Sequence, residues 1–559
     1  MRRQLVGCGL VLVACGGDAA PPSGPIAAMV THYDYRFDIE SRAAHATVTG
    51  VVDTAGDCWT LPFRAQDFNA ATPTIDGQPV NSGTLDASAL TLCGDSHDAG
   101  ETITVDVDMV IPLQTVGPSQ VGYSLTMDTD DNPFYYLVSW VGGCDQFGPC
   151  DSRADQFATY TFHVTHPEPL KVTCPGTITE VSATETQCVF DLPGGPTYST
   201  FGVAAYPTTA WVPIDKGMWG SVHVTLYDRA GTNIDAAVDP THHAGFMTWM
   251  ESQFGAYPYG TELRVLTAPT YWSGFEHPGN ILIDDRLAKG MSTGYLHRVQ
   301  HTLDHEIAHM WAGDETTLAD TYDFVWKEAM AEYLSFVYEA MVEPPAAHAT
   351  LGVWKGSAPG VMYHPIPDER PPLFDFYGDC YGPGPMILFR QVEVMSSRDQ
   401  VLAALKTLLG SPRAISVADV IDALEASTGL ELTEYAAAWL KGTGAPVWPT
   451  FNIQFSPDVP KLGTSTLGVQ QVMAQPKRCK FHVALRGADA EDRVLVEIDT
   501  FNGGLSQQIE VPTPPFTVTA TEIDPDRECL AFPGIVARTE RVNPWLSERG
   551  RAAERAAVD

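Results

Sequence analysis

Basic residues are scarce in this sequence. Its 559 residues include 33 lysines and arginines against 69 aspartates and glutamates, which gives a formal net charge of −36 at pH 7. A negative field of this size repels phosphate backbones and anionic lipid surfaces, and no run of Lys and Arg is long enough to reverse it locally. We therefore expect no nucleic-acid partner.

Charged residues as a whole are also few. They make up 18% of the chain, against about 25% in ordinary globular proteins, whereas hydrophobic residues make up 44%. This composition is typical of a folded protein and excludes an intrinsically disordered one. At roughly 150 residues per domain, the length indicates about three or four domains.

Long hydrophobic runs are absent beyond the N-terminus. The run Leu5–Ala14 follows two arginines and is shorter than the roughly 20 residues that span a bilayer, so it indicates a secretory signal peptide. Residues 12–15, Leu-Val-Ala-Cys, resemble the lipobox of bacterial lipoproteins, which implies cleavage before Cys15 and lipid attachment to its thiol. The alternative is an ordinary signal peptide cut at Ala19 or Ala20. We expect export to the bacterial cell envelope, periplasmic or at the cell surface, with the lipid on Cys15 as the only membrane anchor.

No pair of cysteines has the Cys-x-x-Cys spacing of a zinc ribbon. In an oxidising compartment, the nine cysteines that follow the signal peptide favour disulfides between sequential partners. The predicted pairs are Cys58 with Cys93, Cys144 with Cys150, Cys174 with Cys188 and Cys479 with Cys529, which leaves Cys380 over.

The periodicity of hydrophobic residues changes twice along the chain. Segments such as 102–107 alternate with a period of two, as β-strands do, whereas segments such as 401–409 have a helical period. We predict a multidomain α+β protein. Its parts are a signal peptide and lipobox cysteine (1–15), a linker (16–28), an N-terminal β domain (29–205), an α-rich domain (206–447), a C-terminal β-sandwich (448–533) and a tail (534–559).

Four histidines lie four residues apart, at positions 297, 301, 305 and 309. On a helix, four residues advance about 6 Å and turn only about 40°, so neighbouring members can bind one metal ion. Only His305 and His309 form the pattern HExxH, because Glu306 follows the first of them. In this pattern two imidazoles bind the metal, and the carboxylate lies beside the metal-bound water.

A third ligand is expected on a second helix. Glu328 follows His309 with eighteen residues between, and Glu332 lies one helical turn further on. Either carboxylate completes a His₂Glu zinc site with a fourth position for water, and the spacing alone does not choose between them.

These motifs resemble the aminopeptidase N family of zinc metallopeptidases, the gluzincins, whose pattern is HExxH, eighteen residues and Glu. The resemblance runs through most of the chain after the signal peptide, and it implies a thermolysin-like fold for the α-rich domain. The matching segments are 254–259 and 273–279, the latter at the place of the family's GxMEN motif, 162–167 and 174–176 in the β domain, Trp311 and Gly313, Tyr-x-x-Gly at 381–384, and 439–446.

The resemblance also implies a role for each site residue. It selects Glu328 over Glu332 and makes His305, His309 and Glu328 the ligands of one Zn²⁺ per chain. It implies that Glu306 is the general base and that Tyr381, which competes with Tyr377, donates to the oxyanion. It further implies that Glu276 anchors the free α-amine of a peptide substrate, with Gly274, Phe275 and Gln146 lining the substrate pocket.

The chain departs from the family pattern at several positions. Lys327 stands where the family usually has Asn, next to the third ligand, so the environment of the metal differs. Ser273 and His277 replace members of GxMEN. Gly148 stands for the acid of the family's Gln-x-Glu, which weakens the expectation of strict aminopeptidase specificity.

We predict a zinc-dependent aminopeptidase that hydrolyses N-terminal residues from peptides through a zinc-activated water. One alternative is an endopeptidase or a metallopeptidase of relaxed specificity, against which Glu276 argues. The other is a surface binding protein with a non-catalytic zinc site, against which the general base and the oxyanion donor argue.

Overall fold

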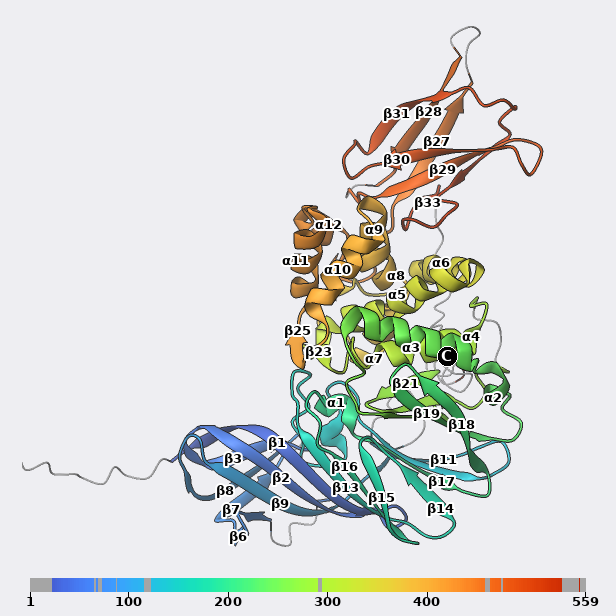
Figure 1. Ribbon diagram of the computed structural model, residues 1–559. Helices are drawn as coiled ribbons and strands as arrows, with labels where there is room; N and C mark the ends of the chain where they lie inside the picture. The colour runs from blue at the N-terminus through green and yellow to red at the C-terminus, as the bar shows by residue number, and fades with distance from the viewer. Residues whose placement is uncertain are drawn as a thin grey trace, which may run out of the picture.

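The computed structural model describes residues 23–64, 67–68, 73–86, 88–114, 122–289, 294–457, 463–473 and 476–534, and residue 552. It has three regions in chain order: a β region, a helix-rich region and a second β region (Figure 1). The predicted signal peptide, Cys15 and nearly all of the predicted tail lie outside the described residues. Among the described helices, none has the length and apolar character needed to cross a bilayer.

The N-terminal region consists of two main sheets. The larger runs in the order β15-β16-β13-β1-β2-β9-β5-β6, with β3, β4, β7 and β8 joined at its side, and the smaller runs β10-β11-β12-β17-β14. The elements are β1 (Pro25–Asp38), β2 (Ala43–Thr54), β3 (Gly56–Pro62), β4 (Asp67–Phe68), β5 (Thr74–Ile75), β6 (Gln78–Pro79), β7 (Ser82–Leu85), β8 (Ala89–His97), β9 (Thr102–Val110), β10 (Leu113–Gln114), β11 (Gly122–Met127), β12 (Pro133–Val138), η1 (Cys144–Gln146), β13 (Thr159–Thr165), β14 (Leu170–Thr173), β15 (Thr177–Ser182), β16 (Glu185–Phe190), α1 (Thr197–Thr200) and β17 (Gly202–Pro207).

The first strand begins earlier than the predicted domain. β1 starts at Pro25, within the segment 16–28 that we predicted as a linker. The reason is local pairing, because Pro25 and Ile26 pair with Cys58 and Trp59 of β3, and Ile26 is buried. A short run rich in Pro, Gly and Ala therefore forms a strand because it pairs with β3 and because Ile26 is buried in the core.

The predicted disulfides are confirmed. The structure joins the sequential pairs, and Cys380 is buried outside all four, where its thiol donates a hydrogen bond to the carbonyl of Phe376.

The helix-rich region contains a five-stranded sheet in the order β18-β19-β20-β22-β21, in which β21 is an edge strand antiparallel to β22. Helices α3, α4 and α5 lie above this sheet (Figure 1). The strands are β18 (Trp211–Trp219), β19 (Val222–Arg229), β20 (Glu262–Ala268), β21 (Gly274–His277), β22 (Asn280–Asp284), β23 (Thr316–Leu318), β24 (Ile366–Pro367), β25 (Arg413–Ile415) and β26 (Lys441–Gly442). The helices are α2 (Ile234–Ala237), α3 (Pro240–Phe254), α4 (Arg298–Ala308), η2 (Thr321–Asp323), α5 (Phe324–Val342), α6 (Pro344–Ser357), η3 (Ala358–Gly360), α7 (Leu373–Asp379), α8 (Pro383–Pro385), η4 (Met386–Arg390), α9 (Gln391–Met395), α10 (Arg398–Leu408), α11 (Val417–Thr428) and α12 (Thr433–Trp439).

Helix α5 is the centre of this region. Its residues from Phe324 to Glu339 are all buried, as expected for a helix that is apolar on every face. The short helix η2 precedes it and is closed by a capping box between Asp320 and Asp323, which fixes where α5 begins. Polar side chains on such a helix are enclosed by protein, so each of them needs a partner or a chemical purpose.

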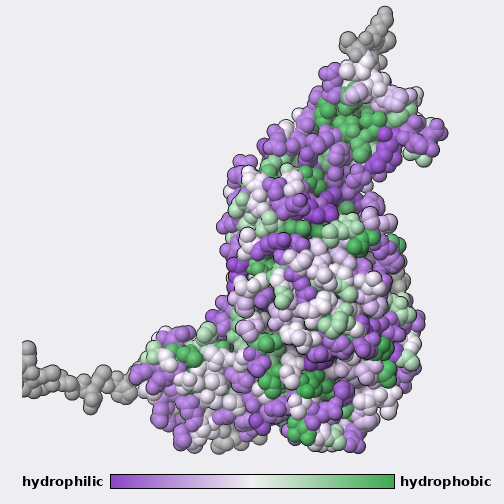
Figure 2. Space-filling model, in the orientation of Figure 1, coloured by the Kyte–Doolittle hydropathy of each residue, from purple (hydrophilic) through white to green (hydrophobic). Residues whose placement is uncertain are grey.

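The C-terminal region has two sheets, β31-β28-β27-β33 and β30-β29-β32. Phe451 and Phe481 meet across them with ring centroids 4.9 Å apart, as expected for the predicted β-sandwich. Hydrophilic residues are spread over all three regions of the face shown in Figure 2. The strands are β27 (Thr450–Ser456), β28 (Thr464–Gln471), β29 (Lys480–Arg486), β30 (Arg493–Asp499), β31 (Ser506–Pro512), β32 (Ala520–Ile523) and β33 (Phe532–Pro533).

Candidate active site

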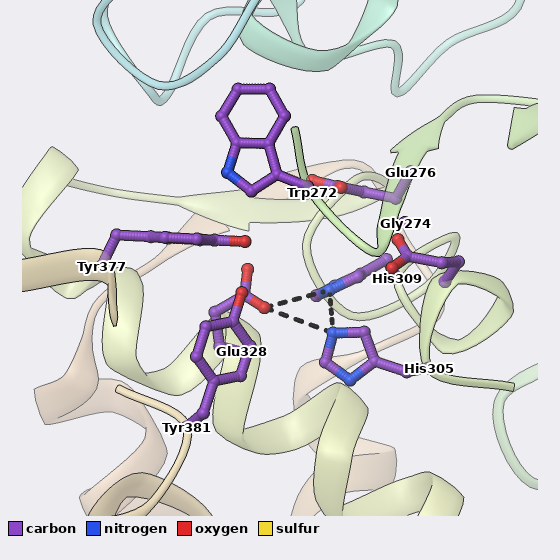
Figure 3. A pocket seen from close by; sticks show the side chains of 9 residues that line it. Trp272, Gly274, Glu276, His305, His309, Glu328, Tyr377 and Tyr381 are labelled. Atoms are coloured by element: carbon purple, nitrogen blue, oxygen red, sulfur yellow. Dashed lines mark hydrogen bonds and ion pairs between the residues drawn. The ribbon is translucent and has the colours of Figure 1, made fainter. Parts of the chain in front are cut away.

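One pocket brings together side chains from four segments of the helix-rich region. Helices α4 and α5 supply one wall, the edge strand β21 with the residue two before it supplies another, and the segment from α7 to α8 supplies two tyrosines (Figure 3). The cavity between them measures about 10 Å³, room for about one water molecule. The lining residues are Trp272, Gly274, Glu276, His305, Glu306, His309, Glu328, Tyr377 and Tyr381.

The three predicted zinc ligands converge at this pocket. Glu328 Oε2 lies 3.3 Å from His305 Nε2 and 3.4 Å from His309 Nε2, and the two Nε2 atoms are 2.9 Å apart. All three side chains are buried. They form a compact triangle of possible ligand atoms (Figure 3).

The Nδ1 atoms of both imidazoles have hydrogen-bond partners on the side away from the pocket. His309 Nδ1 lies 2.9 Å from the carbonyl oxygen of Ala312, and His305 Nδ1 lies 3.1 Å from Glu332 Oε2. Both partners accept hydrogen bonds, so each Nδ1 is a donor and each ring directs its Nε2 at the same Glu328 oxygen. Burial lowers the pKa of His305, but Glu328 and Glu332 outweigh burial and raise it to about 9 in the metal-free site. A bound metal ion takes the place of the proton on Nε2. This donor set therefore fits Zn²⁺.

The rival ligand Glu332 faces the other side of His305. Its oxygens accept hydrogen bonds from Tyr295 at 2.9 Å, from Trp354 at 2.6 Å and from His301 at 3.1 Å, besides His305. Glu332 thus holds the ring of a predicted ligand in place and has no lone pair directed at the pocket.

The remaining histidines of the four-residue series belong elsewhere. Both nitrogens of His301 contact carboxylates, Nε2 on Glu332 and Nδ1 on Glu339 at 2.7 Å. Burial lowers the pKa of His301, but these two acids outweigh burial and raise it to about 10, so the ring is a cation that cannot bind a metal. His297 is the residue before the first turn of α4, and its side chain pairs with Glu343 at the surface.

Glu306 packs against the backbone of β21. A Cβ atom at Gly274 would collide with the Glu306 carboxylate, so glycine permits the close approach. Burial raises the pKa of Glu306 well above its usual value, which favours a carboxylate that takes up a proton readily.

Tyr377 and Tyr381 both reach the pocket. Their rings lie at right angles with centroids 5.3 Å apart, and both phenol groups point toward Glu328 (Figure 3). Burial raises the pKa of each well above the usual value, so both hydroxyl groups remain protonated and able to donate. The geometry alone does not choose between them.

Glu276 has a partner that the sequence did not predict. Lys327 is 1% exposed, and its Nζ lies 2.6 Å from Glu276 Oε1 and 2.9 Å from Glu328 Oε1. Burial lowers the pKa of Lys327, but the two carboxylates outweigh burial and hold the pKa well above its usual value. The sequence shows Lys327 next to Glu328, but nothing local indicates that it is buried against Glu276.

Two predicted substrate-binding residues are not among those that line the pocket. Phe275 points into the core, where its ring contacts Trp272 and His277. Gln146 lies on η1, between the cysteines of the Cys144–Cys150 disulfide, and is half-buried. Their roles in substrate binding stay predictions.

Gly148, which stands for the acid of the family's Gln-x-Glu motif, has no room for a side chain. A Cβ atom at Gly148 would collide with the ring of Tyr35, whose hydroxyl donates to the carbonyl of Pro149 at 3.0 Å. The backbone there packs on an aromatic ring of β1, which leaves no space for a longer side chain.

Comparison with known sequences supports the family resemblance. A model of the Peptidase family M1 domain matches residues 240–358. Aminopeptidase 2 of Candida albicans is 25% identical over 250 residues, covering 40% of this chain and 26% of that protein. Aminopeptidase N of Streptomyces lividans is 26% identical over 309 residues, covering 48% of this chain and 34% of that protein. The matched parts are thus about a third or less of these relatives' own length.

Solved structures share the fold. Legionella pneumophila aminopeptidase A, in complex with aspartic acid, superposes with a TM-score of 0.70 at 14% identity, covering 93% of this chain and 60% of that one. An M1 zinc metallopeptidase of Deinococcus radiodurans, bound to a Tyr-Ser-Ala substrate, gives 0.60 at 19% identity and covers 75% and 96%. The HExxH helix and the acid on α5 lie within residues 240–358, the part of the chain that matches the Peptidase family M1 domain, and the architecture is shared with a solved M1 zinc metallopeptidase.

Proposed function

We propose that this protein is a zinc-dependent aminopeptidase that hydrolyses the N-terminal peptide bond of peptides. The observation that carries the proposal is that His305, His309 and Glu328 converge in the same pocket as Glu306 and Tyr381. A structural zinc site needs neither a general base nor a hydroxyl group directed at the metal. The relatives named aminopeptidases support the proposal.

The metal would be held by His305, His309 and Glu328. When bound there, Zn²⁺ lowers the pKa of a water molecule to about 7 and polarises the scissile carbonyl. Glu332 and the carbonyl of Ala312 keep the two imidazoles oriented, so the ligands are arranged before the ion arrives.

The chain supplies the proton transfers. Glu306 takes the proton of the attacking water and returns it to the leaving amine, a task suited to its raised pKa. The hydroxyl of Tyr381 donates to the oxygen that becomes negative in the transition state. Trp272 lies across the pocket from Tyr381 and His305 (Figure 3).

The proposal is tested with Glu306→Gln. We expect this variant to retain one zinc per chain and to lose activity by about a thousandfold or more, measured by metal analysis and hydrolysis of aminoacyl 4-nitroanilides. Glu491→Gln, which changes an exposed acid of the C-terminal region, is the matched control and should keep full activity. Normal turnover by Glu306→Gln would contradict the mechanism.

A metallopeptidase of relaxed specificity is the second candidate. One observation favours it, namely that the predicted amine anchor Glu276 already pairs with Lys327. The consequence of this ion pair is developed in the next subsection.

We also propose that the protein is exported and anchored through a lipid on Cys15. The charged start, the short apolar run and the Leu-Val-Ala-Cys sequence at 12–15 support this, and the four disulfides agree with an oxidising compartment. Expressed in a bacterial host, Cys15→Ser should abolish incorporation of labelled fatty acid and move the protein from the detergent phase to the aqueous phase. Cys8→Ser is the control and should change neither result.

A further inference from the structure

The substrate-amine position of this site contains a cation of the protein itself. Lys327 extends from α5 between two carboxylates, and its ammonium group lies 2.6 Å from Glu276 Oε1. On the proposed function, Glu276 is the group that pairs with the ammonium of the substrate. We propose that Lys327 is a specificity-determining residue that neutralises Glu276, so that this enzyme accepts peptides with a neutral, N-acylated terminus nearly as well as those with a free amine.

Among the described residues that line the pocket, no further acid remains to attract the substrate's ammonium. The acids that line the pocket are Glu276, Glu306 and Glu328. Glu328 is a predicted metal ligand and Glu306 the predicted base, which leaves Glu276 for the amine. Gly148 packs against Tyr35 at the position where the family has a further acid. The pair of Glu276 and Lys327 therefore carries no net charge toward a substrate.

The remaining oxygen of Glu276, Oε2, can still accept a hydrogen bond. Among the described residues, Oε2 has no hydrogen-bond partner, and Glu276 faces the pocket. An ammonium bound to Oε2 would lie roughly 5 Å from Lys327 Nζ, given hydrogen bonds of about 2.8 Å. Repulsion between the two cations at that distance weakens binding on the order of tenfold to a hundredfold. The N–H of an acylated terminus donates to the same oxygen without this repulsion.

Lys327 is held in place by its surroundings. Its ammonium also bonds to Glu328 Oε1 at 2.9 Å, its alkyl chain lies against Gly313, and its Nζ is 5.3 Å from the ring centre of Phe324. Moving it aside to admit a substrate amine would leave two buried carboxylates without their partner, which is costly. The cation is thus a fixed part of the pocket.

The test compares an aminoacyl 4-nitroanilide with its N-acetylated form. In the zinc-loaded native enzyme, kcat/KM for the two substrates should differ by less than about tenfold. In Lys327→Gln, which keeps a donor but removes the charge, the preference for the free amine should rise by about tenfold or more, through a lower KM. Lys327→Arg keeps the charge and should keep the native ratio. Zinc analysis of each variant separates this effect from metal loss.

Two results would overturn the inference: a native preference for the free amine above about a hundredfold, or an unchanged ratio in zinc-replete Lys327→Gln. The native ratio decides even if the variant does not fold. Binding is also measured by calorimetry in the Glu306→Gln background, where Lys327→Gln should tighten only the free-amine form, and equal changes for both forms would count against Lys327. If the native enzyme cleaves neither substrate, the proposed function fails, while the binding measurement still decides the role of Lys327.

Discussion

Helix α4 carries members of two histidine–carboxylate clusters that point in different directions. One cluster is His305, His309 and Glu328, and the other is Asp304 with His242 and His243 of α3. Asp304 and His305 are neighbours in sequence, so their side chains point about 100° apart around the helix. In both clusters the possible ligand atoms lie within 4.8 Å of one another.

The two clusters differ in how donors and acceptors are arranged. His242 Nε2 and His243 Nδ1 lie 2.7 and 2.8 Å from different oxygens of Asp304, so each imidazole donates to its own acceptor. In the other cluster both Nε2 atoms face the same oxygen of Glu328 and each other. In the Asp304 cluster each imidazole has an acceptor oxygen of its own, whereas in the Glu328 cluster two imidazole nitrogens share one oxygen. Proximity of ligand types is therefore a weaker indication of a metal site than two imidazole nitrogens that converge on one carboxylate oxygen.

The largest expected effect comes from making the same substitution in each cluster. Glu328→Gln removes the anionic ligand, and we expect zinc to fall from one per chain to near zero and activity by at least about a thousandfold. Asp304→Asn keeps the metal, because its side chain belongs to the hydrogen-bonded cluster. Metal analysis after dialysis against buffer, together with hydrolysis rates, measures both. Equal zinc loss in the two variants would mean that the clusters are not distinct.

The next largest effect is expected from the two tyrosine hydroxyl groups beside the Glu328 cluster. Tyr381→Phe removes one hydroxyl group from the pocket, and we expect kcat to fall by about a hundredfold with KM nearly unchanged, because the contact exists only in the transition state. Tyr377→Phe, four residues away, is the matched control and should change kcat by less than about threefold. The reverse order of the two effects would transfer the oxyanion role to Tyr377.

Several features of the site could be predicted from sequence because they depend on short-range spacing. HExxH is a property of one helix, so His305, Glu306 and His309 follow from the pattern alone. Choosing Glu328 over Glu332 required the family resemblance. The structure supplies a physical reason for that choice, since Glu332 is occupied by Tyr295, Trp354 and two histidines from other segments.

Other features depend on contacts between distant segments and had no local signal. Lys327 and Glu276 are 51 residues apart, and only the packing of α5 beside β21 places their charges in contact. The start of β1 at Pro25 likewise depends on pairing with β3. The order of β, helical and β regions was predictable from the hydrophobic periodicity within each region. The disulfides were predicted by pairing sequential cysteines, a hypothesis that the structure confirms.

A stability measurement tests the cluster of Asp304, His242 and His243. His243 is fully buried and stacks on Trp219 with ring centroids 5.0 Å apart. His243→Phe keeps the stacking but leaves Asp304 with one partner fewer, so we expect a loss of about 2 kcal/mol in the free energy of unfolding. Zinc content should stay at one per chain. Denaturant unfolding followed by fluorescence measures the loss, and a variant as stable as the native protein would show that the hydrogen bond contributes little.

The smallest effect is a dependence of this cluster on pH. Burial lowers the pKa of His242, but the charge of Asp304 outweighs it and the net pKa is raised. Because the pKa in the folded state is above that of the unfolded chain, the contribution of His242 is fully present below about pH 6.5 and is lost as pH rises through the folded value. Relative to His242→Gln, the native protein should therefore be more stable by about 1 kcal/mol at pH 6, with the difference shrinking toward pH 9. Denaturation at each pH measures it. The Asp304→Asn background removes the charge that raises the pKa, so there the difference should no longer shrink with pH; a difference that still shrinks would assign the pH dependence to another group.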